Sequence, residues 1–327
     1  MKKLSKVLII VFGSLAGFIL LFLLGFRLYF RIPVSSYYKV SKKAFVIPDT
    51  NRNFVSQGLT YDEKAENFYL TGYMKDNSAC PVYIVNKNSK KLIKTIKLSN
   101  PDNTPFVNHC GGLSLYQNNI YIAGGHDNCL YVFDKNEIDQ AENKSSVTYK
   151  NIISLETEDD MIGVAFTTTD KDMLIAGEFY RLPQYPTLPK HEITTIDGTN
   201  NAIALAFTLS DNKAVPSYVY SLPGNVQGMA FSDEKIYVST SWGLSFSNIL
   251  IYDRSKITSN GTMTVLDTEV PLYILDSSSL EKTIKTAPMS EEIEFIDGKL
   301  YQVNESASNK YVFGKFTGGK YSYYSEF

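Results

Sequence analysis

The hydrophobic and polar positions of this chain form one short pattern that returns five times. Its first copy, SQGLTYDEKAENFYLTG from Ser56, has two segments of alternating apolar and polar residues joined by a polar turn. Alternation with a period of two is typical of half-buried β-strands, and the turn between the segments predicts a hairpin. The other copies are CGGLSLYQNNIYIAGG from Cys110, MIGVAFTTTDKDMLIAGE from Met161, VQGMAFSDEKIYVSTSWG from Val226 and SEEIEFIDGKLYQVNES from Ser290.

Further strand-like segments follow each hairpin, so that each unit contains about four short strands. The aligned positions Gly58, Gly112, Gly163, Gly228 and Glu292 lie 51 to 65 residues apart. Such a period, once loops are included, is typical of propeller blades, which bury their faces only by stacking around an axis. We therefore predict an all-β fold, a five-bladed β-propeller. A six-bladed propeller, with the extra blade in 181–225 or 253–288, is the alternative, and a β-sandwich is a third interpretation.

The ends of the chain bear on how this ring closes. The fifth unit is short of outer-strand sequence, although Lys310–Phe316 is expected to supply its third strand. Lys43–Ile47 has strand character and precedes the first unit, so we expect it to pair into the fifth blade. Pro271–Leu275 is expected to extend the fourth unit.

The N-terminus carries a different pattern. Lys2, Lys3 and Lys6 precede an apolar run from Val7 to Phe26, and Arg27 and Arg31 follow it. The run would measure about 30 Å as a helix, enough to cross a bilayer. We predict an uncleaved anchor over residues 1–31, a linker over 32–42 and the propeller over 43–327; a cleaved signal peptide is the rival interpretation. The lysines favour a cytoplasmic N-terminus and hence a single-pass protein of the cell membrane with an extracellular propeller.

Composition narrows the function classes. Tyr (23) and Phe (19) are abundant, which favours strands, and the net charge of −2 shows no basic block. A sequence-independent grip on nucleic acid needs a basic face, so we expect no nucleic-acid partner. The sequence contains no CxxC, HExxH, GxSxG or phosphate-loop motif, and whether the chain is an enzyme stays open.

Hairpin geometry predicts where a binding site would form. The start of each inner strand and the end of its partner lie at the same end of the hairpin, so these positions should surround one mouth of the central channel. Aromatic walls with a few convergent polar groups are typical of ligand sites. The candidate ligand-binding residues are Gln57, His109, His126, Asp160, Glu178, Gln227, Trp242, Glu291, Glu292 and Glu305.

Two chemistries are open at this mouth. His109, Asp160 and Glu291 could coordinate one divalent cation, since imidazole and carboxylate suit zinc, manganese or iron, although such histidines more often bond a backbone carbonyl. Adjacent carboxylates on a strand point to opposite faces, so at most one of Glu291 and Glu292 is expected to enter the channel. Cys80, Cys110 and Cys129 are also expected near this face, and spacing alone does not fix a disulfide pair.

Four stretches carry a family resemblance: HCGG from His109, VQGMAF from Val226, TSWG from Thr240, and Ala287–Tyr311. Over most of residues 50–320 the chain resembles secreted or membrane-anchored bacterial propeller proteins of uncertain function. More loosely it is similar to lactonase-like and strictosidine-synthase-like propellers. That resemblance implies six blades and a calcium or other divalent ion in the channel, but no ligand set of this chain matches residue by residue.

Two function hypotheses follow. In the first, a membrane-anchored extracellular propeller binds a glycan, a small molecule or a surface protein at its channel mouth. In the alternative, the chain is a metal-dependent hydrolase or lactonase with the ion in the channel, where it would polarise a carbonyl or activate water.

Overall fold

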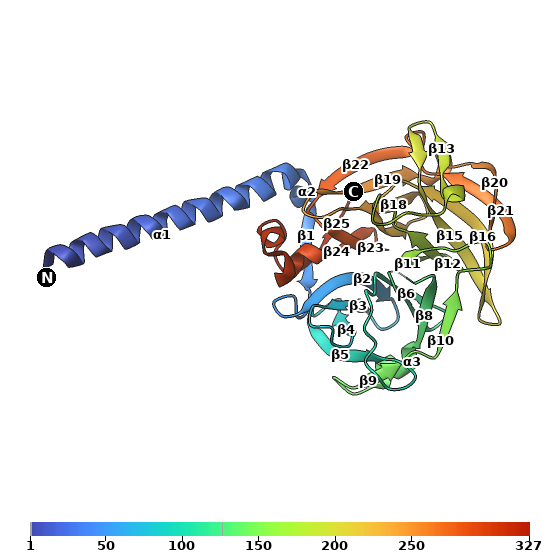
Figure 1. Cartoon of the computed structure of the whole chain (residues 1–327), viewed down its shortest axis with the longest axis horizontal. Helices are drawn as coiled ribbons and strands as arrows, with labels where there is room; N and C mark the ends of the chain where they lie inside the picture. The colour runs from blue at the N-terminus through green and yellow to red at the C-terminus, as the bar shows by residue number, and fades with distance from the viewer. Residues whose placement is uncertain (1, 126) are drawn as a thin grey trace.

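The computed structural model describes residues 2–125 and 127–327. Five β-sheets surround a common axis, and a long helix, α1 (Lys2–Arg31), projects from one side of the ring (Figure 1). The fold is a five-bladed β-propeller, as the repeats predicted. The six-bladed alternative is wrong, because residues 259–274 join an existing blade and 181–225 contain two strands of the third blade and a small separate hairpin.

The blades follow the chain, with the inner strand first. Blade one holds β2 (Phe54–Asp62), β3 (Asn67–Met74), β4 (Pro81–Asn86), β5 (Leu92–Ser99) and the added β9 (Ser146–Thr148). Blade two holds β6 (Gly112–Tyr116), β7 (Asn119–Ala123), β8 (Cys129–Asp134) and β10 (Asn151–Ser154). Blade three holds β11 (Val164–Asp170), β12 (Met173–Glu178), β15 (Ala202–Ser210), β16 (Lys213–Leu222), β21 (Thr268–Ile274) and β20 (Ser259–Val265).

The remaining blades and connections complete the ring. Blade four holds β17 (Val226–Phe231), β18 (Lys235–Thr240), β19 (Ser247–Asp253) and β22 (Leu280–Thr286); blade five holds β23 (Ser290–Ile296), β24 (Lys299–Asn304), β25 (Tyr321–Ser325) and β1 (Ser41–Val46). The connections include η1 (Ile32–Val34), α2 (Ser35–Val40), α3 (Lys135–Gln140), η2 (Pro189–His191), β13 (Ile193–Thr195), β14 (Gly198–Asn200), η3 (Arg254–Lys256), η4 (Glu305–Ala307) and η5 (Asn309–Phe316).

The core lies between neighbouring blades. One cluster joins Tyr69 and Ile84 of blade one to Ile122 and Phe133 of blade two, all buried. The inner strands are buried on both faces, whereas the outer strand β5 exposes Leu92 and Ile93 at its start. This gradient from axis to rim explains why the inner hairpins are the most regular part of the sequence pattern.

The first and last strands close the ring. β1 runs antiparallel to β25, with Ser41 opposite Ser325 and Lys43 opposite Tyr323, so the predicted pairing of the N-terminal segment into blade five is confirmed. Ile47, directly after β1, is fully buried between blades five and one.

Two predicted strand assignments are wrong. Lys310–Phe316 forms the helical turns of η5 rather than a strand, and β25 takes the expected place beside β24. Pro271–Leu275 does not extend blade four: β21 runs parallel to β16 of blade three, with Val219 opposite Leu272. Its hairpin with β20 buries Met263, Val265 and Val270 against the outer part of blade three, which supplies the physical reason.

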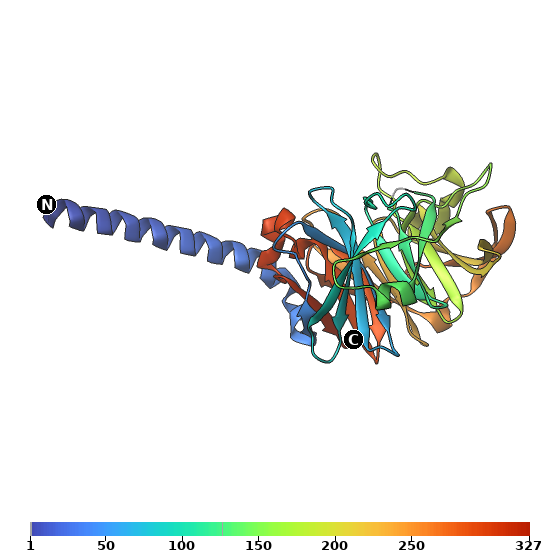
Figure 2. The same cartoon turned by 90° about the horizontal axis from the view of Figure 1, so that it is seen from below.

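The N-terminal helix is a candidate membrane span by length and composition, and its most apolar window is not buried against the rest of the molecule. It stands away from the ring in both views (Figures 1 and 2). Such a helix fits either a signal anchor or a signal sequence. Its end docks on the ring through Phe30 and Phe246, whose ring centroids are 6.4 Å apart, and Tyr37 of α2 donates a hydrogen bond of 2.8 Å to Gln302 of β24. Of the linker expected over residues 32–42, residues 32–40 are helical and 41–42 begin β1.

Candidate functional site

A β-bulge recurs at one end of the inner strands. The pairing register shifts after Ser56 in β2, Val164 in β11, Val226 in β17 and Ser290 in β23. A bulge inserts a residue and re-aims its side chain. The residues at this position, with the matching one before β6, all line one pocket: Gln57, Gly111, Ala165, Gln227 and Glu291. In the third unit the residue after the bulge is Phe166, so the predicted alignment on Gly163 is displaced by three residues.

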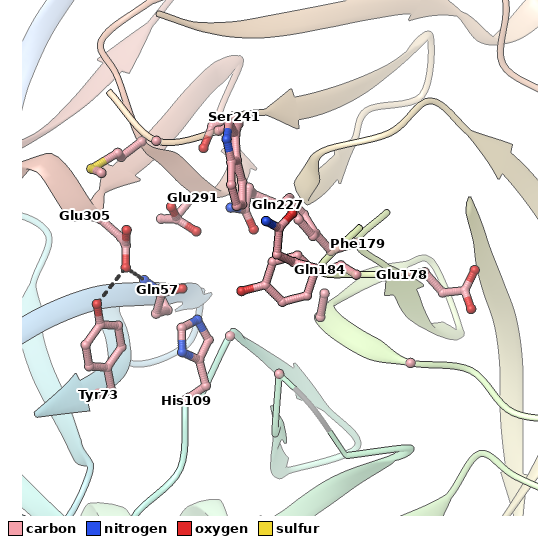
Figure 3. A pocket seen from close by; sticks show the side chains of 18 of the residues that line it. Gln57, Tyr73, His109, Glu178, Phe179, Gln184, Gln227, Ser241, Glu291 and Glu305 are labelled. Carbon is pink, nitrogen blue, oxygen red and sulfur yellow. Dashed lines mark hydrogen bonds between the residues drawn. The ribbon is translucent and has the colours of Figure 1, made fainter. Parts of the chain in front are cut away.

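This pocket occupies the channel mouth and has a volume of about 610 Å³ (Figure 3). We call it the mouth pocket. Most of the candidate site residues line it, namely Gln57, His109, Glu178, Gln227, Trp242, Glu291 and Glu305. Asp160 and Glu292 are not among its lining residues, and His126 lies outside the residues that the structure describes.

Two carboxyl groups dominate one side of the mouth pocket. Glu305 accepts hydrogen bonds from Gln57 Nε2 at 2.7 Å and from the Tyr73 hydroxyl at 3.0 Å (Figure 3), and Lys310 donates to the same hydroxyl. Glu291 is 1% exposed, and its Oε2 has no hydrogen-bond partner among the described residues. Burial, reinforced by the neighbouring Glu305 and Glu292, raises the pKa of Glu291 well above its usual value.

Aromatic side chains form another part of the lining. The Phe179 and Trp242 rings stack with centroids 6.1 Å apart, and Tyr185 meets Trp242 edge-on. The Arg181 guanidinium lies 4.3 Å from the centroid of the Trp242 ring, a cation–π contact. Sequence reasoning missed the contribution of Gln184–Leu188, which comes from the proline-containing insertion; its aromatic Tyr185 was the available signal.

Glu292 has a structural position deeper in the channel. Its Oε2 accepts the backbone N–H groups of Leu59 at 2.7 Å and Leu113 at 2.9 Å, on the inner strands of blades one and two. The expectation that only one of Glu291 and Glu292 enters the channel is wrong, because the bulge interrupts strand alternation and turns both inward. Burial raises the pKa of Glu292 well above its ordinary value, opposed by these backbone hydrogen bonds.

Asp160 and Glu178 are held by His191, the histidine that sequence reasoning did not single out. His191 Nδ1 lies 3.0 Å from both carboxylate oxygens of Glu178, and its Nε2 lies 3.5 Å from Asp160 Oδ1. Asp160 also accepts the Leu266 N–H at 2.7 Å and pairs with Lys190 at 2.8 Å. Glu178 therefore lines the pocket while its carboxylate points away from it (Figure 3). We call these three buried residues the His191 cluster.

The predicted metal ligands do not come together. Asp160 belongs to the His191 cluster, whereas the His109 ring stacks on Tyr73 with centroids 5.0 Å apart. Within residues 2–125 and 127–327, no group of three or more His, Cys, Asp or Glu side chains is placed to hold a metal ion. The other two members of the predicted set, His109 and Glu291, line the mouth pocket.

All three cysteines are free thiols. Cys80 and Cys110 are fully buried next to each other, and the Cys80 thiol donates to the Asn108 carbonyl at 3.0 Å. Burial and the neighbouring Cys80 raise the pKa of Cys110 well above its ordinary value. Cys129, by contrast, is only partly buried.

Comparisons with known proteins identify no family for this chain. No family model matches the chain, and no curated protein gives a significant sequence match. Among solved structures, a luciferin-regenerating enzyme shares 13% identity over 87% of this chain and 94% of its own, with a TM-score of 0.44. A glutaminyl cyclase from Myxococcus xanthus shares 8% identity over 88% and 95%, with a TM-score of 0.44. A PQQ-bound aldose sugar dehydrogenase from Streptomyces coelicolor shares 11% over 87% and 96%, with a TM-score of 0.48. At these identities and TM-scores the likenesses carry no argument about this chain.

Proposed function

We propose that this chain is a membrane-anchored propeller that binds a small organic ligand in the mouth pocket. The observation that carries the proposal is that one pocket combines the stacked rings of Phe179 and Trp242 with Glu291, whose Oε2 has no hydrogen-bond partner among the described residues. Ligand pockets typically enclose about 300–1,000 Å³ and combine apolar walls with a few fixed polar groups. The mouth pocket has this size and this composition.

The arrangement favours recognition over metal-dependent hydrolysis. The alternative function requires a metal held by His109, Asp160 and Glu291, and the described residues contain no three-ligand group. A concave pocket of this size also suits a small molecule better than the broad, flat contact of a typical protein partner. Among the targets open at the sequence level, a small organic molecule therefore has the strongest support.

The placement of the pocket relative to a membrane belongs to the same proposal. An apolar helix at the N-terminus would tether the ring, and the lysines before it favour a cytoplasmic N-terminus. The propeller would then sample ligands outside the cell while it stays at the cell membrane.

The single tryptophan offers a direct test, because Trp242 lines the mouth pocket and is 36% exposed. Full-length protein in detergent micelles should be titrated with one aromatic amine, one aromatic alcohol and one amino sugar, with Trp242 emission recorded. At least one compound should change the emission saturably. Ala165→Leu, which narrows the pocket, should remove that change, whereas Lys256→Ala on the distant η3 turn should retain it. The same response from Ala165→Leu would reject the mouth pocket as the site.

A further inference from the structure

Among the described residues, the charges around the mouth pocket leave one acid without a partner. Its described lining contains the acids Glu178, Glu291 and Glu305, and Lys310 is its one lysine or arginine. Glu178 is matched by His191 of the His191 cluster, with both oxygens 3.0 Å from Nδ1. Glu305 is matched through the Tyr73 hydroxyl, which donates to it and accepts from Lys310. Glu291 is the acid that remains.

A buried carboxyl group without a partner is costly unless something satisfies it. Glu291 Oε2 has no hydrogen-bond partner among the described residues, and the side chain sits on the β23 bulge at the pocket wall. The bulge fixes the direction of this side chain, and it does so by interrupting the regular pairing of the strand. A ligand group that donates hydrogen bonds and carries positive charge would complement it best, since charge-assisted hydrogen bonds are the strong ones.

The aromatic wall defines the other end of the ligand. Phe179, Tyr185 and Trp242 form one contiguous group of rings in the lining of the same pocket. Arg181 already covers Trp242, with the guanidinium 4.3 Å from the ring centroid, so the cation–π position on this ring is taken by the protein itself. The wall is therefore suited to a flat apolar group rather than to a second cation.

We propose that the ligand is a primary ammonium compound with an apolar ring, its ammonium group bonded to Glu291 and its ring packed against Phe179, Tyr185 and Trp242. This assignment rests on the proposed function and names the ligand class of the same pocket. A neutral sugar would find hydrogen-bond partners in Gln57 and Gln227, but it would leave the charge of Glu291 uncompensated.

Proton release should accompany binding. Because burial raises the pKa of Glu291, the group holds a proton more readily in the empty pocket than a free glutamic acid does. An ammonium group stabilises the ionised carboxylate and expels that proton, whereas an uncharged ligand has no such effect. The affinity for an amine should consequently rise with pH over the range in which Glu291 titrates.

The test compares phenethylamine with 2-phenylethanol, which has a hydroxyl in place of the ammonium group. Full-length protein is titrated with each, by Trp242 emission and by calorimetry in two buffers of different protonation enthalpy. A charge-assisted hydrogen bond predicts at least about tenfold tighter binding of the amine, with proton release. Glu291→Gln should remove both the preference and the proton release. Glu281→Gln, which alters a surface partner of Lys235, is the matched control and should behave like the unchanged protein.

The outcomes separate this inference from the proposed function. Equal or tighter binding of 2-phenylethanol or of N-acetylglucosamine would overturn the ammonium assignment and leave the mouth pocket as a binding site. Competition by calcium ions at the same site, at lower concentration than the amine, would also overturn it in favour of a metal site. If neither Trp242 emission nor calorimetry detected binding of the amine, the alcohol or the sugar, the result would count against both proposals.

Discussion

At the scale of single residues, the close approach of inner strands decides which side chains the axis accepts. A Cβ on Gly58 would lie 2.8 Å from Leu113 Cβ, and one on Gly112 would lie 2.7 Å from the Thr167 backbone nitrogen. Blade five has Glu292 in place of this glycine, and the carboxylate reaches across to bond the amides of Leu59 and Leu113. Glu292 thus ties three inner strands together.

Replacing Glu292 tests this tie. Glu292→Ala should leave two buried N–H groups without an acceptor and lower the free energy of unfolding by about 2–6 kcal/mol, since each orphaned group costs about 1–3 kcal/mol. Glu292→Gln keeps an acceptor oxygen, and because the raised pKa of Glu292 already favours the uncharged form, its effect should stay below about 1 kcal/mol. Urea denaturation followed by Trp242 emission measures the free energy of unfolding of both variants. Equal losses of stability would contradict the role of Glu292 in joining the three inner strands.

The acids of the channel also set a pH dependence. Burial raises the pKa of Glu294 to about 8, and the pKa values of Glu291, Glu292 and Glu305 are raised as well. The folded state then binds more protons than the unfolded chain, whose Glu pKa is about 4.3. Stability should therefore be fully present below about pH 4.3 for these groups and fall as pH rises toward 8, by at most about 1.4 kcal/mol per pH unit for each.

Melting temperatures recorded between about pH 5 and 8.5 measure this slope. Glu294→Gln removes one titrating group and should flatten it, whereas Glu326→Gln at the exposed C-terminal end should not. A melting temperature that rises steadily with pH in this interval would show that other groups outweigh the channel acids.

Sequence reasoning placed seven of the ten candidate site residues around one pocket, because hairpin geometry fixes which strand ends share a face. It failed where local geometry departs from a regular strand. The bulge at Glu291 and Glu292 breaks the alternation that the prediction assumed. It also gave no role to His191, whose partners Asp160 and Glu178 lie 31 and 13 residues away along the chain and meet it only in the folded insertion.

At the scale of elements, the insertion after β12 is held to the ring by the His191 cluster. His191 is fully buried and touches Glu178 at the end of β12, while Asp160 bonds the Leu266 amide in the turn between β20 and β21. The segment before β11, the end of β12 and the insertion therefore meet at His191, and Asp160 links them to the turn between β20 and β21. The same insertion supplies Gln184–Leu188 to the mouth pocket, so the cluster also positions part of the pocket wall.

His191→Ala should be strongly destabilising, because it leaves the buried carboxylates of Asp160 and Glu178 short of a partner. Breaking a buried pair typically costs about 3–5 kcal/mol. Lys190→Ala is the matched control: it removes another contact to Asp160, but its side chain is 39% exposed, and exposed pairs contribute about 0–1 kcal/mol. Urea denaturation of the two variants measures the difference, and similar losses would reject His191 as the main support of the insertion.

The elements outside the inner hairpins were the hardest to assign from sequence. Apolar strands such as Pro271–Leu275 fit any exposed sheet edge, and the choice of blade three over blade four depends on side-chain packing by Met263 and Val270 that a linear pattern does not encode. Lys310–Phe316 has a strand-like composition but forms η5, which packs beside α1 through Phe316 and Phe26 with centroids 6.2 Å apart.

At the scale of the whole molecule, the ring and the helix form one connected unit. Phe30 at the end of α1 and Tyr37 of α2 are buried against blades four and five, and the next residues continue directly into β1. The strand that closes the propeller is therefore the strand that leads out of the apolar helix. If α1 spans a membrane, the ring is held close to the bilayer, with no free linker over residues 32–40.

This geometry gives the extracellular placement a sharp test by cysteine labelling in intact cells. Cys80 and Cys110 are fully buried and should not react, so the Cys129→Ser variant should show no labelling of its own. Asn260→Cys, on the exposed β20 end, should then react with a membrane-impermeant maleimide without permeabilisation. Ser5→Cys, before the apolar run, should react only after permeabilisation, because a single span separates the two positions. The reverse pattern would place the propeller in the cytoplasm, and release of the ring into the medium would identify the helix as a cleaved signal.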